Sequence, residues 1–284
     1  MYMPSTVLSI IIPTYKRGTI LRECLQHIEE QTVKDQLEVI VVSDGEMDNE
    51  TQQIAKESFQ VPVTFLSIPK SQQGAARNRG VREAKGTYVL FIGDDIHLAP
   101  DACEIHLKLQ TSPEGKGHRA VLGYVAWDPS VEITPVMRWL DQTGWQFGFS
   151  FLKTHAFVLK QDQHRFTYAS HISLPTDIAR SIPFMEGINL YGWEDVEWGM
   201  RLRDAGVRLF YEPDAKAWHR HTMTMEDSLK RMETLGRSAA TLENMRPELR
   251  LVPKGWKRLA YDFIAHLPTT RGQHAEAFLR GLDS

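Results

Sequence analysis

The stretch TYVLFIGDDI, residues 87–96, decides how the rest of the chain is interpreted. Residues 87–93 form a short, mostly apolar run, and such a run predicts a strand buried on both faces. Asp94 and Asp95 follow at once, and two clustered carboxylates repel each other unless a cation or hydrogen-bond donors compensate them. Because carboxylate oxygens suit Mg²⁺ and Mn²⁺, we interpret the pair as a metal site, with a capped turn as the alternative.

Three more strand-sized apolar runs precede this stretch, at residues 7–13, 37–43 and 61–68. Helical spacing of apolar or small residues separates them, first over 21–28, then over 54–59 and finally over 76–84. Alternating strands and helices predict a mainly parallel, Rossmann-like α/β sheet with helices on both faces. Ligands of such sheets bind beyond the carboxyl ends of the strands, which directs attention to the residues after Pro13, to Asp44 and to Asp94.

The second half of the chain is less regular. We expect a strand over 119–127, a short helix or turn over 174–182, a helix over 192–206 and a short strand over 207–213. A charged helix follows over 224–245, and an amphipathic segment from residue 254 is interrupted by Pro268. The predicted organisation is one α/β domain over 1–223 with a helical extension over 224–284 packed on it.

Composition excludes several classes of protein. The 284 residues are 42% hydrophobic and 24% charged, which is typical of a folded globular chain. A formal net charge of -3 gives no basic excess for non-specific binding of nucleic acid. Two cysteines, both in predicted helices, exclude a disulfide scaffold, and we expect buried thiols and a cytoplasmic setting. We find no targeting segment and no stretch near the roughly 20 apolar residues of a membrane span.

Candidate binding residues follow the first three strands. The run Pro13, Thr14, Tyr15, Lys16 and Arg17 offers an aromatic ring and hydroxyl groups to a nucleobase, or is a plain basic loop. Asp44 can accept from the imide N–H of uracil, or belongs to an Asp-Gly turn. Arg77, in GAARNRG (74–80), can pair with a phosphate, or is a solvated arginine on a closely packed helix.

Two further groups lie in the second half. Glu194, Asp195 and Glu197 occupy the first turn of the predicted helix, where acids complement the helix dipole but one can also act as a general base. His219 and His221 follow the predicted strand and a Pro-Asp turn. Imidazole nitrogens are suitable ligands for Mn²⁺, although a lone histidine is more often structural.

In their order and spacing these motifs together resemble glycosyltransferase family 2 of the GT-A fold. The resemblance spans residues 7 to about 221 and is carried by IIPTYKR, VVSDG, GAARNRG, LFIGDD, GWEDVEWGMRLRDAG and YEPDAKAWHRH. It implies an inverting, metal-dependent hexosyltransferase that uses a nucleotide-diphosphate sugar, most often a UDP-sugar, with Mn²⁺ or Mg²⁺.

The resemblance also implies residue roles. The nucleotide side would comprise Pro13, Thr14, Tyr15, Arg17, Asp44, Arg77, Asn78 and Asp94. Asp95 would ligate the metal, with His219 or His221 completing the site. Asp195 would be the catalytic base, with Glu194 as the other member of the acid pair. Two departures from the family pattern concern Gly93, which stands where a further acid is common, and residues 169–173, which lack the usual Gly-Asn-x-Ser segment.

Two other functions stay open. A sugar nucleotidyltransferase shares the sheet and the acids but is expected to carry a Gly-rich loop after the first strand, where PTYKRGT has one glycine. A non-catalytic carbohydrate-binding protein would use aromatic side chains for stacking, and the candidates, which are equally suited to a core or a dimer surface, are Trp139, Trp145, Phe147, Phe149 and Phe151.

The acceptor is expected to be a glycan or a lipid-linked saccharide of polysaccharide biosynthesis. In the C-terminal segment, Trp256, Leu259, Ala260, Phe263 and Ile264 share one helical face. We expect this face to pack on the α/β domain or on a second subunit of a homodimer. Membrane contact is therefore expected to be peripheral and weak at most.

Overall fold

The computed structural model describes residues 6–113, 119–188 and 190–284. These residues form a nine-stranded sheet in the order β3-β2-β1-β4-β8-β6-β9-β5, with β7 pairing to β9. The strands are β1 (Leu8–Thr14), β2 (Leu37–Asp44), β3 (Val63–Ile68), β4 (Tyr88–Ile92), β5 (Ile96–Leu98), β6 (Arg119–Trp127), β7 (Ala156–Phe157), β8 (His171–Pro175) and β9 (Arg208–His219).

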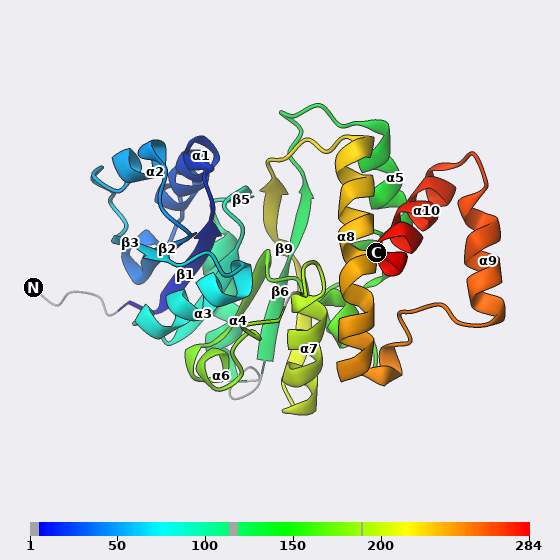
Figure 1. Ribbon diagram of the computed structural model, residues 1–284. Coiled ribbons are helices and arrows are strands. Elements are labelled where there is room, and N and C mark those ends of the chain that lie inside the picture. Colours follow the sequence, from blue (N-terminus) through cyan, green and yellow to red (C-terminus); the bar gives the residue numbers. More distant parts are fainter. Residues whose placement is uncertain (1–5, 114–118, 189) are drawn as a thin grey trace, which may run out of the picture.

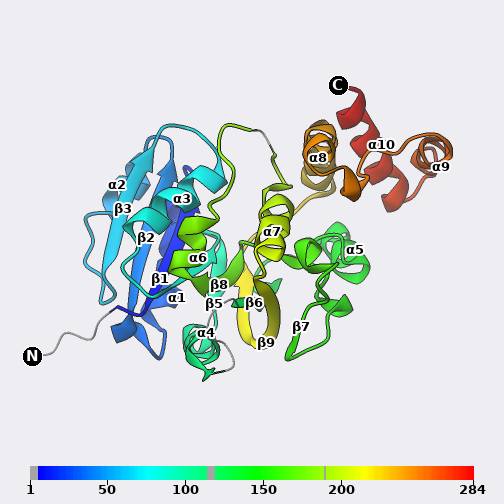
Figure 2. The same cartoon turned by 90° about the horizontal axis from the view of Figure 1, so that it is seen from below.

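Helices flank this sheet on both faces and continue beyond it at the C-terminal end. They are α1 (Gly18–Glu29), α2 (Asn49–Ile54), α3 (Gln73–Glu83), α4 (Ala102–Thr111), α5 (Pro135–Thr143), α6 (Thr176–Ser181), α7 (Glu194–Asp204), α8 (Met225–Met245), α9 (Trp256–Ala265) and α10 (Thr270–Asp283). In both views α8, α9 and α10 stand on the side of the molecule away from β1–β3, while α3 and α4 lie on opposite faces of the sheet (Figures 1 and 2).

The N-terminal part of the sheet is parallel, as predicted. β1 pairs with β2 and β4, and β2 pairs with β3, all in parallel register. Every residue of β1 and β2 is buried, which explains their continuous apolar runs. α3 packs closely on β1 because Gly80 leaves no side chain in the way: a Cβ there would lie 2.5 Å from Cγ2 of Ile11.

Antiparallel pairing enters with β8, which the sequence analysis did not predict as a strand. β8 lies between β4 and β6 and is antiparallel to both. The expected short helix or turn over 174–182 is α6, which begins only at Thr176. Residues 171–173 are polar at alternate positions, yet all are buried, because His171 and Ser173 bond inside the core to His106.

The predicted helix over 54–59 is wrong. The helix α2 covers Asn49–Ile54 instead, because the side chain of Asp48 caps it by accepting from the backbone N–H of Thr51 at 2.8 Å. Residues 55–58 are exposed and offer no apolar side chain to a helix face.

The predicted short strand over 207–213 is also incomplete, because β9 continues to His219. The register with β6 shifts between Gly123 and Tyr124, which pair with Glu212 and Lys216, so residues 213–215 bulge out of the ladder. Pro213 is tolerated there because no ladder bond is required of it. His219 is therefore the last residue of a long, bulged strand and His221 lies just beyond it, so neither follows a Pro-Asp turn.

The C-terminal helices attach to the α/β part through α8. Nε1 of Trp193 donates to the carbonyl of Leu235 at 3.0 Å, and α10 packs along α8. The apolar face of α9 is not covered by the rest of the described chain: Trp256 is 74%, Leu259 70% and Phe263 69% exposed. Packing of this face on the α/β domain is therefore ruled out within the described chain, whereas its burial by a second subunit stays a prediction.

Candidate active site

The acid pair lies directly beyond β4 and is neutralised by one arginine. Oδ2 of Asp94 accepts from Oγ1 of Thr14 at 2.7 Å, and Oδ1 accepts from the Arg17 guanidinium at 2.8 Å. The other nitrogen of that guanidinium lies 2.9 Å from Oδ2 of Asp95. The cation required by two clustered carboxylates is thus partly supplied by Arg17, which the sequence analysis had placed only on the nucleotide side.

Burial and the mutual repulsion of the two acids separate their titration. Burial, followed by the charge of Asp95, raises the pKa of Asp94 above its usual range. Burial would also raise the pKa of Asp95, but the hydrogen bond and charge of His219, together with Arg17, lower it below the ordinary range. Asp95 is therefore the member of the pair that is ionised most easily.

His219 reaches the acid pair from the end of β9. Its Nε2 lies 3.3 Å from Oδ2 of Asp95, and its ring is stacked against Trp127 on one side and His221 on the other. Burial, followed by the charge of His219, lowers the pKa of His221. Backbone pairing explains why His219 lies close to Asp95, because Ile96, which follows Asp95, is opposite His219 in the β5–β9 ladder.

These residues fit a divalent cation. Two ligand atoms on adjacent corners of an octahedral ion lie about 3 Å apart when the bonds are about 2.1 Å, close to the separation of Nε2 and Oδ2. A carboxylate and an imidazole are a donor set suited to Mn²⁺. Nδ1 of His219 is buried and has no hydrogen-bond partner among the described residues. Binding of an ion through Nε2 would therefore break no hydrogen bond of Nδ1.

A cleft of about 780 Å³ opens beside β1, β2 and β3. Tyr15 forms one wall, and Nζ of Lys70 lies 3.5 Å from the centre of its ring. The cleft reaches Gly45, where φ is +123° and a Cβ would approach the Tyr15 ring to 3.1 Å. Pro13 and Thr14 form the buried end of β1 behind it. Its aromatic wall and its two lysines, Lys16 and Lys70, are chemically suited to a nucleoside phosphate.

Asp44 lies next to this cleft but is held by internal partners. Its carboxylate accepts from Nζ of Lys70 at 2.8 Å and from the backbone N–H groups of Ser71 and Gln72. Burial opposes ionisation, but these donors lower the pKa of Asp44 below its ordinary value. Asp44 is an ionised anchor for the 70–72 loop, and base recognition by Asp44 stays a prediction.

Asp195 is the second residue of helix α7 and is hydrogen-bonded to the segment that leads into β8. Its Oδ2 accepts from the backbone N–H of Ala169 at 2.9 Å. Ala169 lies two residues before His171, and His171 is opposite Ile92 in the β4–β8 ladder. Ile92 in turn lies three residues before Asp95. Asp195 and the acid pair thus reach the same edge of the sheet through this ladder. Burial raises the pKa of Asp195, although Arg77 and Arg231 oppose the shift.

Glu194 precedes it and also has a raised pKa, from burial and from the charge of Asp195. Its Oε2 accepts from the backbone N–H of Gly192 at 2.7 Å. The helix N-terminus favours the ionised forms of both acids, whereas burial opposes their ionisation. Either carboxylate can accept a proton at a pH closer to neutrality than an exposed one can.

The helix α3 does not place both of its predicted residues on the nucleotide side. Arg77 is buried beside Phe184, and its charge acts on Glu194 and Asp195. The Asn78 amide bonds to both backbone groups of Phe184 and to Oε1 of Glu186. In this structure Arg77 belongs with the acids of α7, and Asn78 holds the 184–186 segment, so their nucleotide contacts stay predictions.

Arg231 of α8 is a site residue that the sequence analysis missed. Its guanidinium donates to the side chain of Gln146. Its charge opposes the rise in the pKa of Asp195 that burial causes. It lies in a charged helix in which lysine and arginine recur without a distinctive pattern, so only its position near Asp195 in the folded chain identifies it.

The five aromatic candidates divide. Phe149 is buried, and Phe147 packs against the core and lies 6.1 Å from the His219 ring, centre to centre. Trp139 is half-buried and packs against His274 of α10. Trp145 and Phe151 remain 41% and 68% exposed, so these two are the ones free to stack on a sugar.

Comparison with known proteins relates part of this chain to one family. Residues 9–116 match the family model for Glycosyl transferase family 2. We call these residues the family 2 segment. The family 2 segment contains β1–β4 and therefore the acid pair, Arg17 and the Tyr15 cleft.

The curated relatives match only part of this chain. The putative glycosyltransferase EpsH of Bacillus subtilis is 34% identical over 37% of this chain and 31% of its own length. The chondroitin synthase of Pasteurella multocida is 37% identical over 36% of this chain and 11% of its own. The chain thus spans about a third or less of the length of the curated relatives it matches.

Solved structures match the whole fold. Residues 1–349 of S. aureus TarS, in complex with UDP, superpose with a TM-score of 0.59 and 17% identity, covering 98% of this chain and 90% of that one. The mannosyltransferase PcManGT of Pyrobaculum calidifontis, in complex with GDP-Man and Mn²⁺, gives a TM-score of 0.59 and 18% identity, covering 97% and 72%. The fold, with the family 2 segment as its N-terminal part, is the GT-A fold.

No helix of the described ranges has both the length and the apolar composition that crossing a bilayer requires.

Proposed function

We propose that the protein is an inverting, metal-dependent glycosyltransferase that moves a hexosyl group from a nucleotide-diphosphate sugar to a hydroxyl acceptor. One observation carries the proposal: Asp94 and Asp95 beyond β4, His219 at the end of β9 and Asp195 at the start of α7 reach one edge of the sheet. The family 2 match and the GT-A fold support it.

The chemistry assigned to the residues follows from their charges. Asp195 takes the proton of the acceptor hydroxyl while the acceptor oxygen bonds to the anomeric carbon and the bond to the donor diphosphate breaks. A single displacement inverts the anomeric configuration. The charges of Arg77 and Arg231 favour the ionised form of Asp195 and so oppose the effect of burial. Glu194 is the alternative general base, in the case that Asp195 serves only to accept the hydrogen bond from the backbone of Ala169.

Asp95 and His219 would hold Mn²⁺ or Mg²⁺, with His221 as the alternative histidine. When bound, such an ion stabilises the negative charge that develops on the leaving diphosphate. Arg17 holds the two acids in place, and Asp94 with Thr14 lies on the side of the ribose. The role of Gly93 is passive, since it offers no third carboxylate, which makes the imidazole ligand more important.

The donor is proposed to be a UDP-sugar. TarS has been solved with UDP and with UDP-GlcNAc, whereas PcManGT was solved with GDP-Man, so the fold itself accepts more than one base. The base would stack on Tyr15 near Asp44, and Lys16 or Lys70 would face its phosphates. A thermal-shift panel of UDP- and GDP-sugars with Mn²⁺ tests this, because a bound ligand raises the melting temperature.

The acceptor is proposed to be a glycan or lipid-linked saccharide of polysaccharide biosynthesis. Among the relatives are a chondroitin synthase and a poly(ribitol-phosphate) beta-glucosyltransferase. Trp145 and Phe151 are the exposed rings that would stack on such an acceptor. Replacing both with serine should raise the KM for the acceptor while leaving UDP affinity unchanged.

We further propose a cytoplasmic protein, in keeping with its two buried free thiols, with at most weak peripheral membrane contact. The uncovered face of α9 would then bury itself in a homodimer. Sedimentation of the full chain tests both points: a dimer that becomes a monomer in Phe263→Ser supports the proposal. Strong binding to anionic vesicles that persists in high salt contradicts it.

A further inference from the structure

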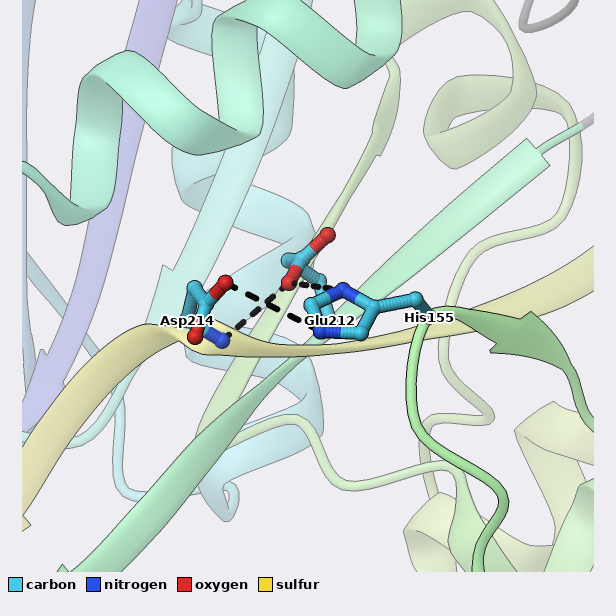
Figure 3. Close-up of side chains that lie close together, drawn as sticks. All are labelled: His155, Glu212 and Asp214. Atoms are coloured by element: carbon cyan, nitrogen blue, oxygen red, sulfur yellow. Dashed lines mark hydrogen bonds and ion pairs between the residues drawn. The ribbon is translucent and has the colours of Figure 1, made fainter.

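A second group of metal-ligand side chains lies away from the candidate active site, where β7 meets β9. The two strands are antiparallel, with Ala156 opposite Tyr211 and Phe157 opposite Phe210. One step further along the same register, His155 is opposite Glu212. Asp214 follows two residues later, on the face of the chain that Glu212 occupies. Figure 3 shows the imidazole of His155 facing the carboxylates of both Glu212 and Asp214.

The three side chains approach one another closely. Nδ1 of His155 lies 3.0 Å from Oε1 of Glu212, and Nε2 lies 3.8 Å from Oδ2 of Asp214. The backbone N–H of Asp214 also donates to Oε1 of Glu212 at 3.1 Å. One ligand atom from each residue can be chosen so that all three lie within 4.8 Å.

The charges of this group are not balanced by a permanent cation. Glu212 is only 7% exposed, and a buried carboxylate requires a compensating charge. In the part of the chain that the structure describes, no lysine or arginine forms an ion pair with Glu212 or Asp214. Among the described residues His155 is the only ion-pair partner of either acid, and one imidazole cannot neutralise two carboxylates.

The backbone is shaped around the same group. The bulge at residues 213–215 brings Asp214 out of the ladder beside Glu212. His155 has a left-handed φ of +50°, an uncommon conformation for a residue other than glycine. The bulge on β9 and the left-handed backbone at His155 thus help to bring the side chains of His155, Glu212 and Asp214 together.

From this geometry we propose that His155, Glu212 and Asp214 bind a divalent transition-metal ion, most suitably Zn²⁺. One imidazole nitrogen and two carboxylate oxygens are ligands that Zn²⁺ accepts, with water in a fourth position. Glu212 precedes His219 by seven residues of β9, and at about 3.3 Å per residue the ion would lie about 20 Å from the candidate active site. Its role is structural: it holds the segment 144–157 against β9. This segment carries Phe147, whose ring contacts that of His219.

Zinc titration of the full chain tests the site in the Asp95→Ala variant, which lacks the carboxylate of the candidate active-site metal. We expect one equivalent of ZnCl₂ to bind by calorimetry and to raise the melting temperature. Adding His155→Asn, which tolerates the left-handed backbone, or Glu212→Gln should weaken zinc binding at least tenfold and remove the thermal shift. His266→Asn, on an exposed histidine, is the matched control and should change neither.

Cobalt provides a readout on the protein with its own side chains, so the test does not depend on the variants folding. CoCl₂ should give the visible absorption of four-coordinate cobalt, which ZnCl₂ abolishes and saturating UDP leaves unchanged. Zinc affinity that is equal with and without His155→Asn, or the absence of this cobalt spectrum from the unsubstituted protein, would overturn the proposal.

Discussion

Nε2 of His219 lies 3.3 Å from Oδ2 of Asp95, although 124 positions separate the two residues in the chain. The contact joins the exit of β4 to the end of β9 across the short β5–β9 ladder. It lies beside Arg17, so the acid pair has both a permanent cation and an imidazole within reach. The predictions below test what this arrangement and its neighbours do.

Asp95→Ala should weaken metal-dependent UDP binding by at least tenfold. The substitution removes the carboxylate proposed to share the ion with His219, and an imidazole alone is a poor site for Mn²⁺. Calorimetry with UDP, with and without Mn²⁺, measures the effect. Asp35→Ala, at an exposed aspartate, is the control and should bind UDP as the unsubstituted protein does. Equal UDP affinity in metal-free buffer would remove the metal role.

Asp195→Asn should keep the fold and UDP affinity but reduce transfer by about 10²- to 10⁴-fold, the usual contribution of a general base. The amide is nearly the size of the carboxylate but cannot accept the proton, so the loss falls on kcat. Asp204→Asn, at the far end of the same helix, should leave transfer unchanged. Near-normal transfer by Asp195→Asn would assign the base to Glu194.

Arg231→Gln should move the acidic limb of the transfer rate to higher pH. Burial raises the pKa of Asp195, and the charge of Arg231 opposes that shift, so removing the charge raises the pKa further. Transfer requires the ionised base and is therefore lost at a higher pH as the solution is acidified. Arg237→Gln, on the same helix but paired with Glu233, serves as the comparison. An unshifted pH profile would contradict an influence of Arg231 on the catalytic base.

His171→Gln should reduce the pH dependence of stability between about pH 6.5 and 4. Burial lowers the pKa of His171 to about 4, below the ordinary value of 6.5. The unfolded chain therefore binds more protons in this window, and stability is lost as the pH falls through it. The variant lacks this titration, so its free energy of unfolding should fall less steeply, by at most about 3 kcal/mol over the window. Identical slopes from urea unfolding would contradict the account, and His266→Gln is the control.

The sequence predicted β1, β2 and β4 because these strands are almost entirely buried and carry continuous apolar runs. It also predicted β3, an edge strand whose residues are half-buried or exposed. It did not predict β8, since His171 and Ser173 are polar and only their partner His106 explains their burial. Pro213 suggested an early end to β9, but a bulge accommodates the proline. Local pattern cannot report such long-range partners.

The same distinction applies to the site. Asp94, Asp95, Asp195 and His219 stand at element ends that the sequence marks, and so each was a candidate. Arg17 as the cation of the acid pair, Arg77 beside Asp195 and the contribution of Arg231 depend on packing between distant elements. No local spacing encodes them.

The most direct test of the proposed function is release of UDP from UDP-sugars by the full chain with Mn²⁺, followed with and without a chelator. The account predicts slow hydrolysis of at least one donor when no acceptor is present, lost with the chelator and in Asp195→Asn. The anomeric configuration of the freed sugar, determined by NMR, should be opposite to that of the donor. Tight binding of UDP-sugars with no turnover of any donor would contradict the account and indicate a non-catalytic carbohydrate-binding protein.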